Sequence, residues 1–308
     1  MSKSNQRKAY GLALVELGKQ NPNVVVLDAD LSKSTQGCLF EAEFPNRYFD
    51  MGIKEQDMMS TAAGFACSEK IPFANSFAMF ATGRPYDQIR QTISIGKLNV
   101  KICGSSAGLS DYADGSTHQS VEDGALMNLI PNMTVLTPVD ANEAAAAVFA
   151  AAEHQGPVYI RLCRNDVLDI TPKDQPFEIG KLRVLREGTD CVIFAMGTMV
   201  ERALEAAETL EQDGISVKAV NVSTLKPFDY AGAEAMTRGC KAVLAAEEAT
   251  FIGGLTGALA TALRKSAVPM DYVAIEDVFG QSAQNAEELM DFYGLTAENI
   301  VKKLKAML

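Results

Sequence analysis

Short runs of apolar, often β-branched residues alternate along this chain with stretches of helical character. In the first half, the expected strands are residues 24–27, 73–76, 100–104, 134–136 and 158–162. Helices are expected beside them, at residues 5–19, 55–68, 86–97, 122–129 and 141–154. Strands that alternate with helices in this way are typical of a parallel sheet covered on both faces. The sequence therefore predicts a doubly wound α/β fold.

The alternation is interrupted once. Residues 166–187 carry Pro172, Pro176 and scattered charges, which are typical of a connecting segment. A second α/β unit follows, with expected strands at 191–197, 217–222, 242–246 and 272–275 and two short helices at the end. A chain of 308 residues with 47% hydrophobic content can bury two cores. We predict one domain over residues 1–170, a linker over 171–188 and a smaller α/β domain over 189–308.

Composition excludes several classes of function. The net charge of -11 argues against nucleic acid or an anionic membrane as the main partner, so an anionic substrate would need locally placed arginines. The six cysteines are widely spread, without a CxxC pair or metal-ligand spacing, which is typical of reduced thiols in a cytoplasmic protein. The N-terminus is polar, and no apolar run approaches the length of a membrane span.

Glu55 lies where a strand-like segment, 48–51, leads into an expected helix. Met58, Met59 and Ala62 recur at near-helical spacing after it. A carboxylate at such a strand-to-helix crevice is partly enclosed, so its pKa is adjustable. The alternative is a solvated glutamate in the first helical turn that complements the helix dipole.

Two phenylalanines follow the expected strand 73–76. Phe77 and Phe80 offer aromatic faces on which a planar heterocycle can stack, although each alone is equally well a core residue. Arg164 follows the strand 158–162 and puts a guanidinium at a strand end. A structural ion pair is one interpretation of Arg164, and a clamp for phosphate or carboxylate is the other.

The segment 104–119 is a long loop of small polar residues, and loops of this length inside a compact domain are usually functional. It carries His118, one of two histidines in the chain, with Asp114 nearby. A structural histidine is the simpler interpretation, but the pair also suits an acid, a base or a ligand for a substrate hydroxyl.

Taken in this order, these residues resemble the C-terminal half of a transketolase. The matching segments are 52–56, 77–80, 86–90, 114–119, 131–133 with 137–138, and 161–164, followed less specifically by 247–248 with 253–255. The resemblance implies a domain that binds the aminopyrimidine ring of thiamine diphosphate, followed by a small α/β domain that stands away from the chemistry.

The resemblance also implies roles for particular residues. Glu55 matches the catalytic glutamate that hydrogen-bonds the pyrimidine ring, and Phe77 and Phe80 match the aromatic wall of its pocket. Asp30, on the loop after the first strand, is a weaker candidate near the thiazolium ring. Cofactor chemistry of this kind is supplied by the cofactor, while the protein orients and polarises it.

Other matching positions concern the substrate. Arg7, Ser34 and Arg164 match residues that bind the phosphate of sugar substrates. Asp114 and His118 match positions that contact substrate hydroxyls, and His118 is a candidate catalytic residue as well. The implied substrates are therefore phosphorylated sugars, between which a two-carbon ketol unit is transferred, as in the pentose phosphate pathway.

Two departures from the family pattern matter. The Gly-Asp-Gly motif that holds Mg²⁺ or Ca²⁺ and the diphosphate is missing, because Ala113 stands before Asp114 and Gly115. We therefore expect no metal site here, and an N-terminal transketolase subunit that brings the metal and diphosphate site, in an α2β2 heterotetramer. With Met1 directly before the first helix, the chain is expected to be the natural second subunit of a split transketolase. Ser106 replaces a substrate-facing histidine of many transketolases.

Three alternatives remain open. Similar architecture occurs in deoxyxylulose-phosphate synthase and in the β subunit of 2-oxoacid dehydrogenases, which also use thiamine diphosphate. A non-catalytic assembly subunit could keep the fold and lose the chemistry. Retention of Glu55, Phe80, His118 and Arg164 together argues against that last alternative.

Overall fold

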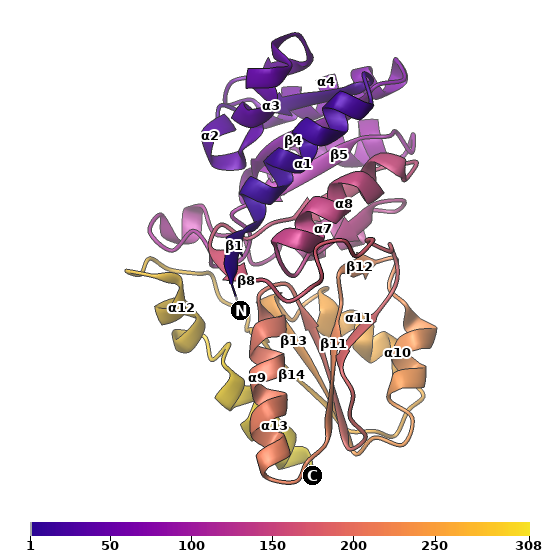
Figure 1. Ribbon diagram of the computed structural model, residues 1–308, viewed down its shortest axis with the longest axis vertical. Helices are drawn as coiled ribbons and strands as arrows, with labels where there is room; N and C mark the ends of the chain where they lie inside the picture. The colour runs from indigo at the N-terminus through magenta and orange to yellow at the C-terminus, as the bar shows by residue number, and fades with distance from the viewer. Residues whose placement is uncertain (1) are drawn as a thin grey trace.

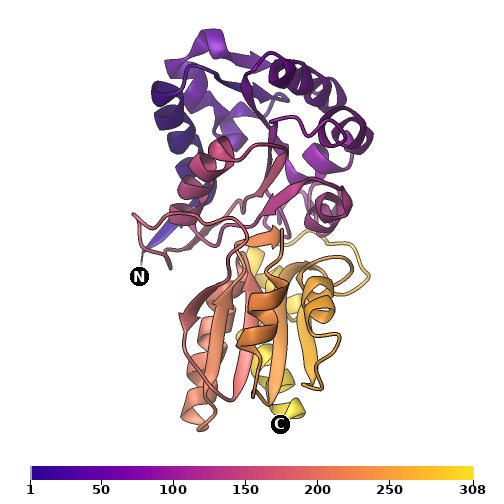
Figure 2. The same ribbon diagram turned by 90° about the vertical axis from the view of Figure 1, so that its right-hand side faces the viewer.

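The computed structural model describes residues 2–308 and shows two α/β units, one above the other (Figures 1 and 2). The N-terminal segment lies at the level where the two units meet, whereas the C-terminus lies at the far end of the second unit. None of the helices within residues 2–308 is both long and apolar enough to cross a bilayer.

The first unit is built on a seven-stranded sheet. Its order is β12-β6-β7-β5-β4-β2-β3, and every neighbouring pair is parallel except β12 with β6. The strands are β2 (Val24–Asp28), β3 (Tyr48–Asp50), β4 (Ile71–Phe77), β5 (Lys101–Ser105), β6 (Thr134–Leu136), β7 (Val158–Arg161) and β12 (Thr224–Lys226). Every residue of β2 is buried, as expected for a parallel strand covered on both faces.

Helices cover both faces of this sheet. One face packs against α1 (Gln6–Gln20), α3 (Gly37–Glu43) and α8 (Ala141–Glu153). The opposite face packs against α4 (Glu55–Cys67), α5 (Ala78–Thr82), α6 (Tyr86–Gln88), the π-helix η2 (Ile89–Ser94) and α7 (Asp123–Leu129). The helix starts are specified locally: the side chain of Asn5 accepts from Lys8 N before α1, and that of Asp140 accepts from Glu143 N before α8.

The second unit has a five-stranded sheet of order β14-β13-β10-β11-β9, parallel except for β9. Its strands are β9 (Arg183–Arg186), β10 (Cys191–Met196), β11 (Val217–Asn221), β13 (Ala242–Thr250) and β14 (Met270–Ile275). One face packs against α9 (Met199–Gln212), α12 (Ala286–Phe292) and α13 (Ala297–Met307), and the other against α10 (Tyr230–Met236) and α11 (Leu255–Ala262).

The doubly wound α/β class is confirmed, and each expected strand is present within a few residues of its predicted bounds. The expected helix 86–97 differs, because it divides into α6 and η2 and ends at Ser94. Four strands were missed. β1 (Lys3–Asn5) pairs with β8 (Asp166–Leu168), while β12 leaves the second unit to join the first sheet. The segment predicted as linker, 171–188, contains β9, so the domain boundaries stay a prediction.

Candidate active site

The candidate residues gather at one edge of the first sheet, beyond the carboxyl ends of five adjacent parallel strands. These strands are β7, β5, β4, β2 and β3, in that spatial order. In the same order, the positions they present are Arg164, Ser106, Phe77, Asp30 and Glu55. Open α/β sheets bind ligands in the crevice outside these strand ends. The topology thus brings together residues from distant parts of the chain, from Asp30 to Arg164.

Glu55 is the first residue of α4, and its side chain is only 4% exposed. Arg84 Nη1 donates a hydrogen bond to Glu55 Oε1 at 2.9 Å, and Arg84 is the hydrogen-bond partner of this carboxylate among the described residues. A solvated glutamate that only complements the helix dipole does not fit this burial. A carboxylate enclosed in this way is available to a buried hydrogen-bond donor.

An aromatic wall stands beside this carboxylate. The rings of Phe77 and Phe80 are 6.1 Å apart and inclined by 19°, with Phe77 buried and Phe80 half-buried. The Arg84 guanidinium lies 4.0 Å from the centroid of the Phe80 ring. Arg84 is therefore a planar donor that rests on an aromatic face while it bonds to Glu55. A flat heterocycle with a hydrogen-bonding edge has the same requirements.

His118 closes the aromatic wall from the loop 104–119. Its ring lies edge-on to Phe80 at 5.2 Å and to Phe77 at 6.4 Å, and Thr117 Oγ1 lies 2.9 Å from Nδ1. Asp114 precedes the short helix η3 (Gly115–Thr117) and is exposed. The structure thus places His118 against the wall and Asp114 at the outer rim.

Arg7, Ser34 and Arg164 also come together. Pairing of β1 with β8 brings Arg7 next to Arg164, where Arg7 Nη2 donates to Arg164 O at 3.1 Å. Arg7 Nη1 donates to Ser34 O at 2.9 Å, and its buried Nε has no hydrogen-bond partner among residues 2–308. Burial and the charge of Arg164 lower the pKa of Arg7. Two neighbouring guanidinium groups with a spare donor suit a bound anion.

Arg164 has an acidic partner that the sequence did not reveal. Arg164 Nη1 donates to Asp111 Oδ2 at 2.7 Å, and the guanidinium lies 6.0 Å from the Phe77 ring. Burial raises the pKa of Asp111, while the charge of Arg164 opposes that rise. Asp111 therefore orients Arg164 toward the aromatic wall. Asp111 lies in the loop 104–119, but nothing in its local sequence indicates the pairing.

Two further positions behave differently from the rest. Asp30 has a left-handed backbone, φ 60°, and an exposed side chain, and its N–H donates to Asp50 Oδ1 at 3.1 Å. Within the described residues, no hydrogen bond joins it to Glu55 or to the arginines. Ser106 also has a left-handed backbone, φ 54°, and its buried Oγ has no partner in the described part of the chain. Ser106 thus carries a buried hydroxyl without a hydrogen-bond partner directly after β5.

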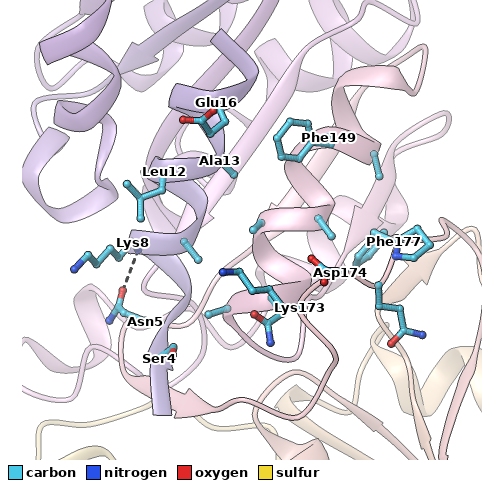
Figure 3. A pocket seen from close by; sticks show the side chains of 18 of the residues that line it. Ser4, Asn5, Lys8, Leu12, Ala13, Glu16, Phe149, Lys173, Asp174 and Phe177 are labelled. Carbon is cyan, nitrogen blue, oxygen red and sulfur yellow. Dashed lines mark hydrogen bonds between the residues drawn. The ribbon is translucent and has the colours of Figure 1, made fainter. Parts of the chain in front are cut away.

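A separate groove of about 860 Å³ runs between α1 and α8 (Figure 3). Leu12 and Ala13 line the groove from α1, Phe149 lines it from α8, and Phe177 lines it from the segment after β8. None of the candidate residues of the active site belongs to its lining. The sheet edge, and not this groove, therefore locates the candidate chemistry.

Two family models match consecutive parts of the chain. "Transketolase, pyrimidine binding domain" matches residues 2–168, and "Transketolase, C-terminal domain" matches residues 180–300. The chain belongs to the transketolase family. All of the candidate site residues lie within the part matched by the pyrimidine-binding domain.

Relatives of similar length agree with this assignment. The chain is 43% identical over 302 residues to a Methanocaldococcus jannaschii protein provisionally named transketolase C-terminal section, covering 97% of this chain and 94% of that protein. It is 40% identical over 297 residues to the 6-deoxy-6-sulfo-D-fructose transketolase subunit SqwH of Clostridium sp., covering 96% and 92%. A solved split gene transketolase, described as an inactive beta4 tetramer, matches with a TM-score of 0.91 and 46% identity, covering 99% of this chain and 98% of that one.

Transketolases use thiamine diphosphate and a divalent metal ion. The residues present fit the aminopyrimidine part of that cofactor, because a buried carboxylate lies beside an aromatic face that already holds a planar, hydrogen-bonding guanidinium. For the metal, residues 2–308 contain no cluster of three or more histidine, cysteine or acidic side chains arranged as ligands.

Proposed function

We propose that this chain is the C-terminal subunit of a split transketolase. Together with a partner chain, it transfers a two-carbon ketol unit from a ketose phosphate to an aldose phosphate. The observation that carries the proposal is the buried Glu55 carboxylate beside Phe80, at the carboxyl edge of a sheet that belongs to a pyrimidine-binding domain. The similarity to a split gene transketolase over nearly the whole length of both chains supports the same division of the enzyme into two subunits.

Thiamine diphosphate, when bound, supplies the nucleophilic carbon and the electron sink of the reaction. Glu55 would hold the pyrimidine ring through a hydrogen bond and exchange a proton with it in a nearly dry environment. Phe80, with Phe77 behind it, would provide the face on which that ring stacks. Arg84 covers the Phe80 ring and bonds to the Glu55 carboxylate, so its side chain has to turn outward before the pyrimidine ring can bind there. The Arg84 side chain is 46% exposed, which leaves it a path to solvent.

Substrate binding is assigned to the part of the site where Arg7 and Arg164 lie together. The guanidinium groups of Arg7 and Arg164 would clamp the terminal anion of the sugar, with Ser34 beside Arg7. His118, at the wall, is positioned to exchange a proton with a substrate hydroxyl, while Asp114 contacts hydroxyls from the rim. Asp30 is kept as a candidate near the thiazolium ring.

Sulfonate is the competing anion. The 40% identical Clostridium relative is named for a sulfo-sugar, and a guanidinium pair accepts sulfonate as well as phosphate. Comparing kcat/KM for phosphorylated and sulfonated donors of equal length separates the two. We propose phosphate as the preferred anion.

The partner is proposed to be an N-terminal transketolase subunit that carries the diphosphate and the Mg²⁺ or Ca²⁺, in an α2β2 assembly acting in the cytoplasm in pentose phosphate metabolism. The split gene relative forms a beta4 tetramer described as inactive, which agrees with a second subunit that lacks activity alone. Closed two-fold symmetry is the common form of such assemblies.

The test is reconstitution. The chain should show no ketol transfer by itself, should gain it when mixed with an N-terminal transketolase subunit, thiamine diphosphate and Mg²⁺, and should then convert phosphorylated ketoses and aldoses. Deoxyxylulose-phosphate synthases match the chain over half of their own length, and they and 2-oxoacid dehydrogenases both release carbon dioxide from a 2-oxoacid. Carbon dioxide release without ketol transfer would favour these alternatives, and an inactive mixture would favour the assembly subunit.

A further inference from the structure

The loop that carries His118 is held at its base by the second unit. Leu109 N donates a hydrogen bond of 2.7 Å to Oε1 of Glu248, which lies 139 residues further along the chain in β13. Thr198 Oγ1 donates to the other oxygen of the same carboxylate. Glu248 is only 4% exposed, so these hydrogen bonds are shielded from solvent. A hydrogen bond between a buried N–H and a carboxylate is among the stronger ones in proteins.

The backbone next to this bond is shaped to receive the carboxylate. Gly108 has φ 66°, and a Cβ at this position would lie 2.4 Å from Glu248 Oε1. Gly108 N donates to Ser120 O at 2.8 Å, and Ser120 N donates to Gly108 O at 3.2 Å. The two ends of the segment 108–120 are therefore tied together where the Glu248 carboxylate fits against Gly108.

Further along, the same loop rests on the segment 281–283 of the second unit. Gln119 Nε2 donates to Gln281 O at 2.9 Å, and Ala283 N donates to Tyr112 O at 2.9 Å. The contacts with Glu248 and with this segment enclose the residues that face the site. They enclose Asp111, which pairs with Arg164, and also His118, which lies against Phe80.

Glu248 is also held in position by the neighbouring ion pair of Arg161 and Asp123. Arg161 Nε bonds to Asp123 at 2.9 Å, and Arg161 Nη2 donates to the carbonyl oxygen of Glu248 at 3.0 Å. Burial raises the pKa of Glu248, while the positive charge of Arg161 and the hydrogen bonds from Thr198 and Leu109 lower it. The carboxylate is thus fixed on both sides of the junction between the two units.

We propose that Glu248 is a positioning residue, through which the second unit holds the loop 108–120 so that His118 and Asp111 face the active site. Its catalytic consequence rests on the proposed function. The family resemblance implied that the smaller domain stands away from the chemistry. Through this contact, that domain would instead position residues of the site directly.

The adjacent residue is a matched control. Glu247 is as deeply buried as Glu248, and its carboxylate accepts three hydrogen bonds, from Leu255 N, Thr256 N and Thr256 Oγ1. All three donors lie at the start of α11, within the second unit. Shortening either glutamate by one methylene, as Glu248→Asp or Glu247→Asp, breaks comparable buried bonds, but only Glu248→Asp releases the loop.

The first readout needs no cofactor. The chain has two histidines, so histidine-selective NMR of the full-length chain reports His118 and His154 separately. The ring currents of Phe80 and Phe77 shift the resonances of the His118 ring. Glu248→Asp should move or broaden these resonances and leave the chemical shifts of His154 unchanged. Glu247→Asp should leave His118 unchanged. Glu248→Gln should restore the wild-type position, because its amide oxygen can accept from Leu109 N and its amide nitrogen can donate to Thr198 Oγ1.

The second readout is kinetic, in the reconstituted enzyme. Glu248→Asp should raise KM for a phosphorylated sugar about tenfold, which corresponds to about 1.4 kcal/mol, without changing the Kd for thiamine diphosphate. An unmoved His118 resonance in Glu248→Asp, or an equal shift in Glu247→Asp, would overturn the proposal. If the His118 resonance moves as expected and the wild-type complex transfers no ketol group, the proposed function fails and the positioning role stands.

Discussion

Replacing Glu55 by glutamine should abolish ketol transfer in the reconstituted enzyme and leave the chain folded. Glutamine fills the same volume and can still accept a hydrogen bond from Arg84, but it cannot exchange a proton. The substitution therefore separates proton exchange by Glu55 from the space that its side chain fills.

The two expected magnitudes differ widely. The bond from Arg84 to Glu55 is made by a guanidinium that is 46% exposed, so replacing the carboxylate by a neutral amide acceptor should cost less than about 1 kcal/mol of the free energy of unfolding. For a protein of this size, that is a fall in Tm of less than about 4 °C. Loss of a general acid or base typically lowers the rate about 10²- to 10⁴-fold, which is about 2.7 to 5.4 kcal/mol of transition-state stabilisation.

The assay is hydrogen-deuterium exchange at C2 of thiamine diphosphate in the reconstituted complex, because it reports proton transfer apart from sugar binding. Asp57→Asn is the matched control, since Asp57 is an exposed carboxylate in the same first turn of α4. It should lose only a small dipole contribution to stability and no activity. A wild-type exchange rate in Glu55→Gln at saturating cofactor would refute the assignment of Glu55.

Three other predictions follow from the same structure. Arg164→Ala should raise KM for phosphorylated sugars about 10- to 100-fold and spare an unphosphorylated donor such as hydroxypyruvate; equal losses for both donors would make Arg164 a structural residue. Calorimetry should detect no tight binding of thiamine diphosphate to the chain without its partner, and sub-micromolar binding would contradict the split site. Burial raises the pKa of Asp28 to about 7 from 3.8, so the folded chain keeps a proton that the unfolded chain loses, and stability should fall as pH rises through that window. Asp28→Asn should flatten that fall in a series of thermal melts, and an unchanged slope would show that Asp28 does not cause it.

Local patterns were sufficient to predict most of the sheet-forming segments and the position of Glu55. Buried parallel strands such as β2 and β7 are continuous apolar runs, and Glu55 directly precedes a regular series of apolar helical positions. Positions after strands and on the loop 104–119 then singled out Phe77, Phe80, His118 and Arg164, to which the family resemblance gave roles, and the structure brings them to one sheet edge. Their roles in catalysis and binding stay predictions.

What the sequence did not reveal depends on contacts between distant segments. Asp111 is an ordinary loop aspartate until β7 brings Arg164 to it, and Glu248 is an ordinary acidic residue until the two units meet. The short strands β1, β8, β9 and β12 were missed because their three or four residues are not continuous buried apolar runs, unlike the equally short β6. Each of them is defined by its pairing partner and not by its own composition.

The strand β12 has a consequence for how this protein can be divided. Thr224–Lys226 belongs in sequence to the second unit, yet it forms the edge of the first sheet by pairing with β6. A chain truncated anywhere between residues 171 and 223 would leave β6 as an open edge, with unpaired backbone groups available to another chain. The pyrimidine-binding unit released in this way should associate through that edge. Isolation of this unit as a monomer would therefore require the strand to be supplied, either by a longer chain or by a peptide that spans residues 223–227.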